Sequence, residues 1–162
     1  NLFSGTDKGF EPESPMTRAM LVTVLRRLSG TSDVPDNIPF SDVQDGKWYT
    51  DGVKWAAANN IISGVSENEF APDKNITREQ LATIIYRYAF EMGYDTTMAE
   101  NSDLSGFVDG ENISPYALSA IKYALSVGII SGRDGARLCP QDGATRAEVA
   151  SILMRFASIE VK

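Results

Sequence analysis

The chain repeats itself, and this repetition limits the folds open to it. Three segments share a Ser-Gly pair, then an apolar residue and a Pro two residues later, then a Thr-Arg pair five residues after the Pro. A unit of this size cannot bury its own apolar face, so the copies are expected to pack around a shared core. Each glycine is interpreted first as a turn residue with positive φ, and second as a point where a ligand approaches the backbone closely. The pairs are Ser4-Gly5 and Thr17-Arg18, Ser63-Gly64 and Thr77-Arg78, and Ser131-Gly132 and Thr145-Arg146.

Each Thr-Arg pair opens a segment with helical periodicity. Apolar residues follow the Thr by four, seven, eight and eleven residues, which is the spacing of one face of an amphipathic helix. Thr is a good N-cap, and Gln80 and Glu148 three residues later predict a capping box that Met20 in the first copy cannot form. The stripes are Leu21, Val24, Leu25 and Leu28; Leu81, Ile84, Ile85 and Tyr88; and Val149, Ile152, Leu153 and Phe156.

A second shared half precedes the second and third copies. It runs from F-x-D through an aromatic residue to W-A or Y-A, and the first copy lacks it. Helices are expected there at residues 50–60 and 114–127, the second with Gly128 as its C-cap. The shared residues are Phe40, Asp42, Trp48, Trp55 and Ala56 in one copy, and Phe107, Asp109, Tyr116, Tyr123 and Ala124 in the other.

The pattern predicts a mainly α-helical fold of tandem helix-loop-helix repeats with little or no sheet. One domain is expected over residues 1–162. It comprises the C-terminal half of a first repeat at 1–30, a second repeat at 38–93, a linker at 94–104 and a third repeat at 105–158. Residues 101–112 superficially follow a calcium-binding loop, but Asn112 stands where the bidentate Glu is needed. A solvated linker without metal is therefore the favoured interpretation.

Composition excludes several functions. A net charge of −7 argues against nucleic acid, because phosphate binding needs a clustered basic surface. The absence of histidine removes His-dependent triads and the usual zinc sites, and a single cysteine cannot form an intramolecular disulfide. No apolar run approaches the ~20 residues that span a bilayer. We expect no nucleic-acid partner, no membrane insertion and no cofactor.

Arginine directly after the capping Thr needs an explanation. A helix start carries about half a positive charge, so a cation there costs about 0.3–1 kcal/mol. Two interpretations are open: a structural ion pair with Asp42 or Asp109, or an anion site made by the guanidinium and the N–H groups of the helix start. The arginines concerned are Arg18, Arg78 and Arg146. A second set nine residues later lies where the helix dipole favours a cation and needs no function: Arg27, Arg87 and Arg155.

Together these residues resemble the S-layer homology family. The matching pattern is F-x-D, an aromatic residue, W-A or Y-A, I-I-S-G, F-x-P and T-R-x-E/Q, over residues 2–28, 40–92 and 107–157. The resemblance implies a pseudo-threefold, three-pronged domain around a central helical bundle. It also implies grooves between the prongs that bind secondary cell-wall polymers, often with a pyruvate ketal on an N-acetylhexosamine. In this family the arginine of the Thr-Arg pair contacts the ketal carboxylate.

The resulting expectation is a non-catalytic, extracellular module in the cell wall or S-layer of a bacterium, anchored non-covalently by an anionic polysaccharide. Aromatic residues are expected to stack on sugar rings, and Ser-Gly backbone groups and Asp side chains to bind hydroxyls. The alternative is a protein–protein assembly module of a surface layer, self-associating through the truncated first repeat. An enzyme is not expected, because no non-repeated pocket is evident. The expected ligand-binding residues are Arg18, Arg78, Arg146, Asp42, Trp48, Ser63, Gly64, Asp109, Tyr116, Ser131 and Gly132.

Overall fold

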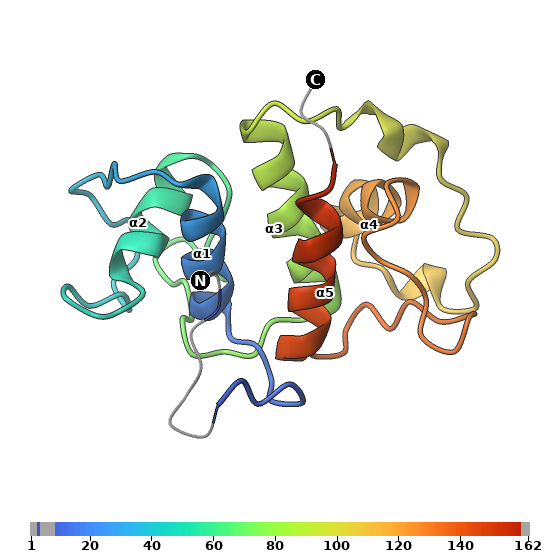
Figure 1. The fold of residues 1–162 in the computed structure, drawn as a ribbon, viewed down its shortest axis with the longest axis horizontal. Helices are drawn as coiled ribbons and strands as arrows, with labels where there is room; N and C mark the ends of the chain where they lie inside the picture. The colour runs from blue at the N-terminus through green and yellow to red at the C-terminus, as the bar shows by residue number, and fades with distance from the viewer. Residues whose placement is uncertain (1–2, 4–8, 160–162) are drawn as a thin grey trace.

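Five α-helices form the framework of the computed structural model, which describes residues 3 and 9–159, without the side chains of residues 100 and 101 (Figure 1). Between residues 9 and 159 there is no strand, only isolated bridges, so the mainly helical prediction is confirmed. The helices are α1 (Arg18–Ser29), α2 (Thr50–Ala58), α3 (Arg78–Glu91), α4 (Leu118–Ser126) and α5 (Arg146–Phe156), with short 3-10 helices η1 (Thr97–Asn101), η2 (Gly110–Asn112) and η3 (Pro115–Ala117).

The three repeated helices begin where the capping Thr predicts. Thr17, Thr77 and Thr145 each accept the N–H of the residue three positions on, and Gln80 and Glu148 complete capping boxes in α3 and α5. The two front helices are shorter than expected. In particular, a 3-10 turn with Pro at its first position precedes α4, and Val127 rather than Gly128 is the C-cap.

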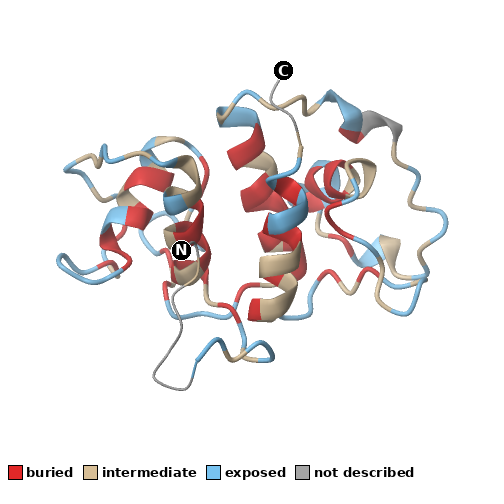
Figure 2. Cartoon of the chain, viewed as in Figure 1, coloured by how far each residue is buried: buried red, intermediate tan, exposed pale blue. Residues whose placement is uncertain are grey.

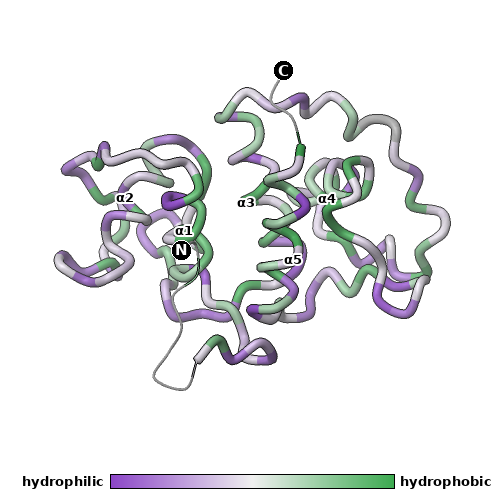
Figure 3. Tube along the Cα trace, viewed as in Figure 1, coloured by the Kyte–Doolittle hydropathy of each residue, from purple (hydrophilic) through white to green (hydrophobic). Residues whose placement is uncertain are grey.

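The apolar stripes of α1, α3 and α5 lie in one core. Every stripe residue is buried except Leu28, which is half-buried. Aromatic contacts connect three of the helices. The ring of Trp55 in α2 lies 6.2 Å from that of Tyr88 in α3, and the Tyr88 ring lies 5.7 Å from that of Phe156 in α5, measured between ring centroids. Figures 2 and 3 show the buried and hydrophobic residues gathered on the helices, while the connecting loops are mostly exposed and hydrophilic. A fully buried stripe residue contributes about 1.5–3 kcal/mol.

A cycle of backbone hydrogen bonds joins the segments that precede the three repeated helices. Met16 donates its N–H to the carbonyl of Ala144 (2.9 Å), Ala144 donates to Ile76 (3.0 Å), and Ile76 donates to Met16 (2.9 Å). All three residues are buried, so the cycle pairs backbone groups that would be costly to leave unpaired. The repeats therefore meet at the starts of α1, α3 and α5. The three-pronged, pseudo-threefold shape of the whole domain stays a prediction.

The first N–H groups of these helices are occupied within the fold. The N–H of Arg18 donates to Lys74 O (3.0 Å), that of Arg78 to Asp142 O (2.9 Å), and that of Arg146 to Ser14 O (2.9 Å). The next N–H in each helix donates to the carbonyl of a loop proline, and the third is capped by Thr. The prediction that helix-start N–H groups share in an anion site is therefore wrong. An anion beside these arginines must therefore be bound by groups other than the helix-start N–H groups.

The glycines of the Ser-Gly pairs do not adopt positive φ. Gly64 and Gly132 are absent from the left-handed residues, and a Cβ on either would lie 2.9 Å from a phenylalanine ring, Phe40 or Phe107. The turn interpretation is wrong for both, and close approach by the chain itself is the reason for glycine. Gly5 lies outside the described residues.

Candidate functional site

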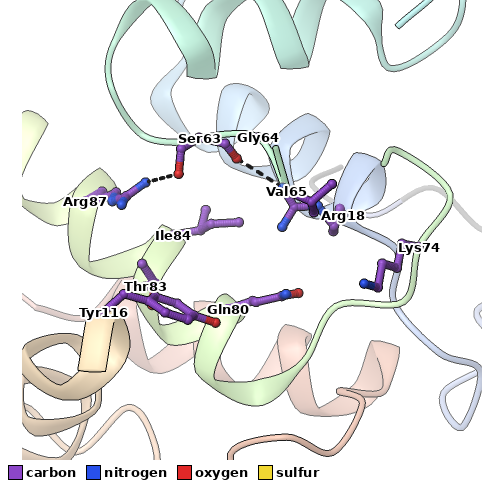
Figure 4. Close-up of a pocket in the computed structure, with 10 residues that line it drawn as sticks. All are labelled: Arg18, Ser63, Gly64, Val65, Lys74, Gln80, Thr83, Ile84, Arg87 and Tyr116. Atoms are coloured by element: carbon purple, nitrogen blue, oxygen red, sulfur yellow. Dashed lines mark hydrogen bonds between the residues drawn. The ribbon is translucent and has the colours of Figure 1, made fainter. Parts of the chain in front are cut away.

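A cavity of about 400 Å³, here called groove A, lies between α1, α3, η3 and the loop that follows α2 (Figure 4). Its charged lining residues are all cations, although the protein carries a net charge of −7. Figure 4 shows Arg87 on one side of the cavity and Arg18 and Lys74 on the other. The lining comprises Arg18, Ser63, Gly64, Val65, Lys74, Gln80, Thr83, Ile84, Arg87 and Tyr116.

Arg18 is held in groove A by carbonyl groups and not by an acid. Its Nε donates to Phe70 O (2.8 Å), its Nη2 donates to Ser63 O (3.2 Å), and the guanidinium lies 4.6 Å from the centroid of the Phe70 ring. Burial lowers the pKa of Arg18 below its ordinary 12.5, against the raising influence of Tyr116 and Asp42, and the group stays cationic at neutral pH. Among the described residues Arg18 makes no ion pair, so the ion-pair interpretation is wrong for this arginine.

Arg87 also belongs to groove A, although the sequence pattern assigned it no function. It lies in the body of α3, and its Nη1 donates to Ser63 Oγ (2.9 Å). Ser63 thus accepts from two cations, through its carbonyl from Arg18 and through its hydroxyl from Arg87. Nine residues turn a helix through about 900°, so Arg78 and Arg87 point from opposite faces of α3. Each therefore lines a different cavity.

Tyr116 reaches groove A from η3 because Glu79 holds it there. The buried Glu79 carboxylate accepts the Tyr116 hydroxyl (2.8 Å) and both the N–H and the hydroxyl of Ser114. Burial, followed by the hydrogen bond to Glu79, raises the pKa of Tyr116 far above its usual value, so the phenol stays protonated. The ring itself is half-exposed and lines the groove.

A second, smaller cavity of about 180 Å³, here called groove B, is built from equivalent residues of the next repeat. Arg78 Nε donates to Leu138 O (2.8 Å) and Nη2 donates to Ser131 O (3.1 Å), matching the contacts of Arg18. Unlike groove A, groove B contains an acid. Glu148 Oε1 lies 3.4 Å from Arg78 Nη1 and 2.7 Å from Arg133 Nη2. The described lining is Arg78, Ile129, Ile130, Ser131, Gly132, Arg133, Glu148, Ser151, Ile152 and Arg155.

The two predicted aspartates hold loops. Asp42 accepts the N–H groups of Phe70 and Ala71 (2.9 and 2.7 Å), and Asp109 accepts those of Leu138 and Cys139 (2.8 Å each). Asp109 also lines a third, open hollow beside Arg137. A role of either carboxylate in binding hydroxyls stays a prediction.

Trp48 and Arg146 line neither groove. Trp48 is exposed and packs edge-on against Tyr49, with ring centroids 5.2 Å apart. Arg146 repeats the contact of the other arginines, donating its Nε to Phe10 O (2.7 Å), and its Nη1 faces Met20 Sδ at 3.8 Å. The structure therefore brings together Arg18, Ser63, Gly64 and Tyr116 in one site, and Arg78, Ser131 and Gly132 in another.

Acid should weaken the fold through Glu148. Burial opposes its ionisation, but the N–H of Thr145 and the neighbouring Arg133 and Arg78 outweigh burial and hold its pKa below 4.5. A lowered folded pKa gives stability that is present above the unfolded pKa and lost as pH falls through the folded value. Glu148→Gln should therefore cost about 1 kcal/mol at pH 7, and the difference should shrink towards pH 3. Urea unfolding across this range checks it, with exposed Glu91→Gln as control; parallel curves for wild type and Glu148→Gln would contradict the argument.

Comparison with known proteins assigns the family. The family model for the S-layer homology domain matches residues 39–82 and 106–150, together more than half of the chain. The chain belongs to the S-layer homology domain family. Both matched segments contain residues of the grooves, including Gly64 and Glu148.

Similar proteins include an enzyme and two surface proteins. Exoglucanase XynX of Acetivibrio thermocellus is 34% identical over 91% of this chain, a match that covers 13% of that protein. The surface-layer 125 kDa protein of Lysinibacillus sphaericus is 31% identical over 90% of the chain and 12% of its own length. The cellulosome-anchoring protein of Acetivibrio thermocellus is 26% identical over 90% of the chain and 33% of its own length. The chain therefore spans only a minor part of each relative.

These matches indicate a cell-surface, cell-wall location for this S-layer homology domain. None of the described helices combines the length and apolar character needed to cross a membrane. Within the same residues no group of three or more acidic or cysteine side chains lies close enough to hold a metal ion.

Proposed function

We propose that this S-layer homology domain anchors a protein non-covalently to the cell wall by binding an anionic polysaccharide, and that groove A binds one of its acidic sugars. The observation that carries the proposal is the set of cations in groove A, Arg18, Lys74 and Arg87, with no acid among its lining residues. A cavity of about 400 Å³ lies within the range of small-molecule sites.

The contacts of Arg18 suit it to a carboxylate. Its Nε and Nη2 are fixed on carbonyl oxygens, and no acceptor contacts Nη1 among the described residues. A guanidinium held in this way is already oriented, so little side-chain entropy is lost when a carboxylate binds. We assign the carboxylate of a pyruvate ketal to this position, with Arg87 and Lys74 as further cations.

Tyr116 and the apolar side chains complete the proposed site. The half-exposed Tyr116 ring offers a flat face for the C–H groups of a sugar, and Val65 and Ile84 give the groove apolar wall. Glu79 acts as a positioning residue, because it fixes the phenol end of Tyr116. A polymer that repeats the acidic sugar presents it at a high effective concentration, so tight binding of a single sugar is not required.

Removing two groove cations should weaken wall binding. Lys74→Gln/Arg87→Gln is expected to lower the affinity for purified walls about tenfold or more, because both charges face the proposed ligand and neither side chain is buried. Lys47→Gln/Lys122→Gln removes the same charge from outside the cavities and should bind as wild type does. Co-sedimentation with walls measures both variants.

Walls stripped of their secondary polymer provide the second arm of the test. Wild type should bind intact walls whose polymer carries pyruvylated sugars and should not bind stripped walls. Equal binding to both wall preparations would reject the polysaccharide as the ligand. Concentration-dependent self-association of wild type, together with equal wall binding, would favour the assembly-module alternative.

A further inference from the structure

Grooves A and B are equivalent in construction but differ in charge at three lining or flanking positions. In each groove the arginine at the helix start binds two loop carbonyls through Nε and Nη2. The differences lie after the Ser-Gly pair, two residues after the loop Pro, and at the third residue of the helix that lines the groove. These positions hold Val65, Lys74 and Gln80 in groove A, and Arg133, Asp142 and Glu148 in groove B.

In groove B the three residues at these positions are joined by ion pairs, Arg133 with both Asp142 and Glu148. Arg133 donates from Nε and Nη2 to Glu148 Oε1 (3.1 and 2.7 Å) and from Nη1 to Asp142 Oδ2 (2.8 Å). The same Glu148 oxygen lies 3.4 Å from Arg78 Nη1, the atom that the equivalent Arg18 has free among the described residues. Two of the three cations of groove B, Arg78 and Arg133, are thus paired with acids from within the chain. The third, Arg155, donates to the carbonyl of Ile129.

In groove A the three substitutions remove this neutralisation. Gln80 keeps the capping role, because its amide oxygen accepts the N–H of Thr77 as Glu148 accepts that of Thr145, but it carries no charge. Val65 stands where groove B has Arg133, so no second arginine needs an acid in groove A. Lys74 stands where groove B has Asp142, so a cation takes the place of an acid. Groove A is also more than twice the volume of groove B, about 400 against 180 Å³.

We propose that only groove A is open to an acidic sugar, and that Glu148 closes groove B by occupying the position of the ligand carboxylate. The third residue of the lining helix, Gln80 or Glu148, then determines which groove binds. This inference rests on the proposed function, since it assumes a carboxylate ligand. The two grooves are therefore not interchangeable sites along the polymer: one is the binding site and the other is held shut by an internal acid.

Reciprocal exchange at this position tests the inference. The probe is the methyl glycoside of an N-acetylhexosamine carrying a pyruvate ketal, titrated into ¹⁵N-labelled protein while amide shifts are followed in each groove. Wild type should respond in groove A and not in groove B. Gln80→Glu should weaken groove A about tenfold or more, since a carboxylate would then face Arg18, and Glu148→Gln should make groove B respond. Both changes keep a capping oxygen, so the fold is retained, and the amide spectrum itself reports this.

Charge-matched controls and the contrary outcomes complete the design. Glu91→Gln and Gln44→Glu make the same changes at exposed positions outside the grooves and should leave both grooves as in wild type. Equal affinities of the two grooves in wild type, or a groove B that stays silent in Glu148→Gln while groove A binds, would overturn the inference alone. Absence of any response in wild type and in Glu148→Gln would instead contradict the proposed function.

Discussion

Gly64→Ala is expected to destabilise the domain by about 3 kcal/mol, lowering its melting temperature by about 10 °C. A Cβ at this position would overlap the carbonyl oxygen of Ser66, lie 2.5 Å from that of Glu69 and lie 2.9 Å from the Phe40 ring. Backbone atoms cannot move aside as a flexible side chain can, because Glu69 O also accepts the N–H of Val65 (2.7 Å). The loop that carries the Ser63 carbonyl must therefore shift.

Two further glycines calibrate this result. Gly132→Ala meets the Phe107 ring at 2.9 Å but the nearest carbonyl only at 3.2 Å, so its cost should be smaller, about 1–2 kcal/mol. Gly106 is exposed and lacks positive φ, and a Cβ at this position would meet no atom within 4 Å, so Gly106→Ala should stay within about 0.5 kcal/mol. Thermal unfolding of the three variants measures the order. A melting temperature of Gly64→Ala equal to that of Gly106→Ala would show that the loop yields freely.

Sequence alone predicts the repeated helices well because several local signals agree. The capping Thr, the third-residue Gln80 or Glu148 and the apolar stripe each place the start of the helix at the same residue. The front helices carry fewer such signals. Pro115 fits the first turn of a helix, yet residues 115–117 form a 3-10 turn, so α4 begins only at Leu118.

The composition of the two grooves is harder to predict because their residues come from distant parts of the chain. Arg18 and Phe70, which contact each other, are 52 residues apart, and Arg78 and Glu148 are 70 apart. A capping box explains Glu148 fully at the level of sequence, so its second role as the acid of groove B gives no additional local signal. The spacing of nine residues between Arg78 and Arg87 does carry a signal in the sequence. It places the two side chains on opposite faces of one helix, which indicates that they belong to different sites.

The backbone conformation before each loop proline is a feature that the sequence does not predict. The residue before each Pro of the F-x-P motif adopts the left-handed conformation without being glycine: Glu11, Ala71 and Cys139 have φ of 49°, 58° and 49°. Such a conformation costs about 1–2 kcal/mol for an L-residue and needs support from its surroundings. For Ala71 and Cys139 the support is the aspartate that accepts their N–H groups.

Asp42→Asn is accordingly expected to cost about 2–3 kcal/mol and to weaken groove A at the same time. One carboxylate oxygen accepts the N–H of Phe70 and the other that of Ala71, so an amide keeps one bond and turns a donor towards the other N–H. The carbonyl of Phe70 is the acceptor for Arg18 Nε, which links the loop to the guanidinium. Urea unfolding measures the loss of stability.

Asp45→Asn is the matched control for this change. Asp45 is exposed and pairs with Lys54 at 3.1 Å, and a surface pair of this kind is worth no more than about 1 kcal/mol. If Asp42→Asn lowers the free energy of unfolding by no more than Asp45→Asn does, the carboxylate does not hold the left-handed turn. If Asp42→Asn is destabilised but binds the pyruvylated probe as wild type does, the turn supports the fold without positioning Arg18. Loss of both stability and affinity is the expected result, because one carboxylate supports the strained loop and that loop supplies a carbonyl that orients the arginine.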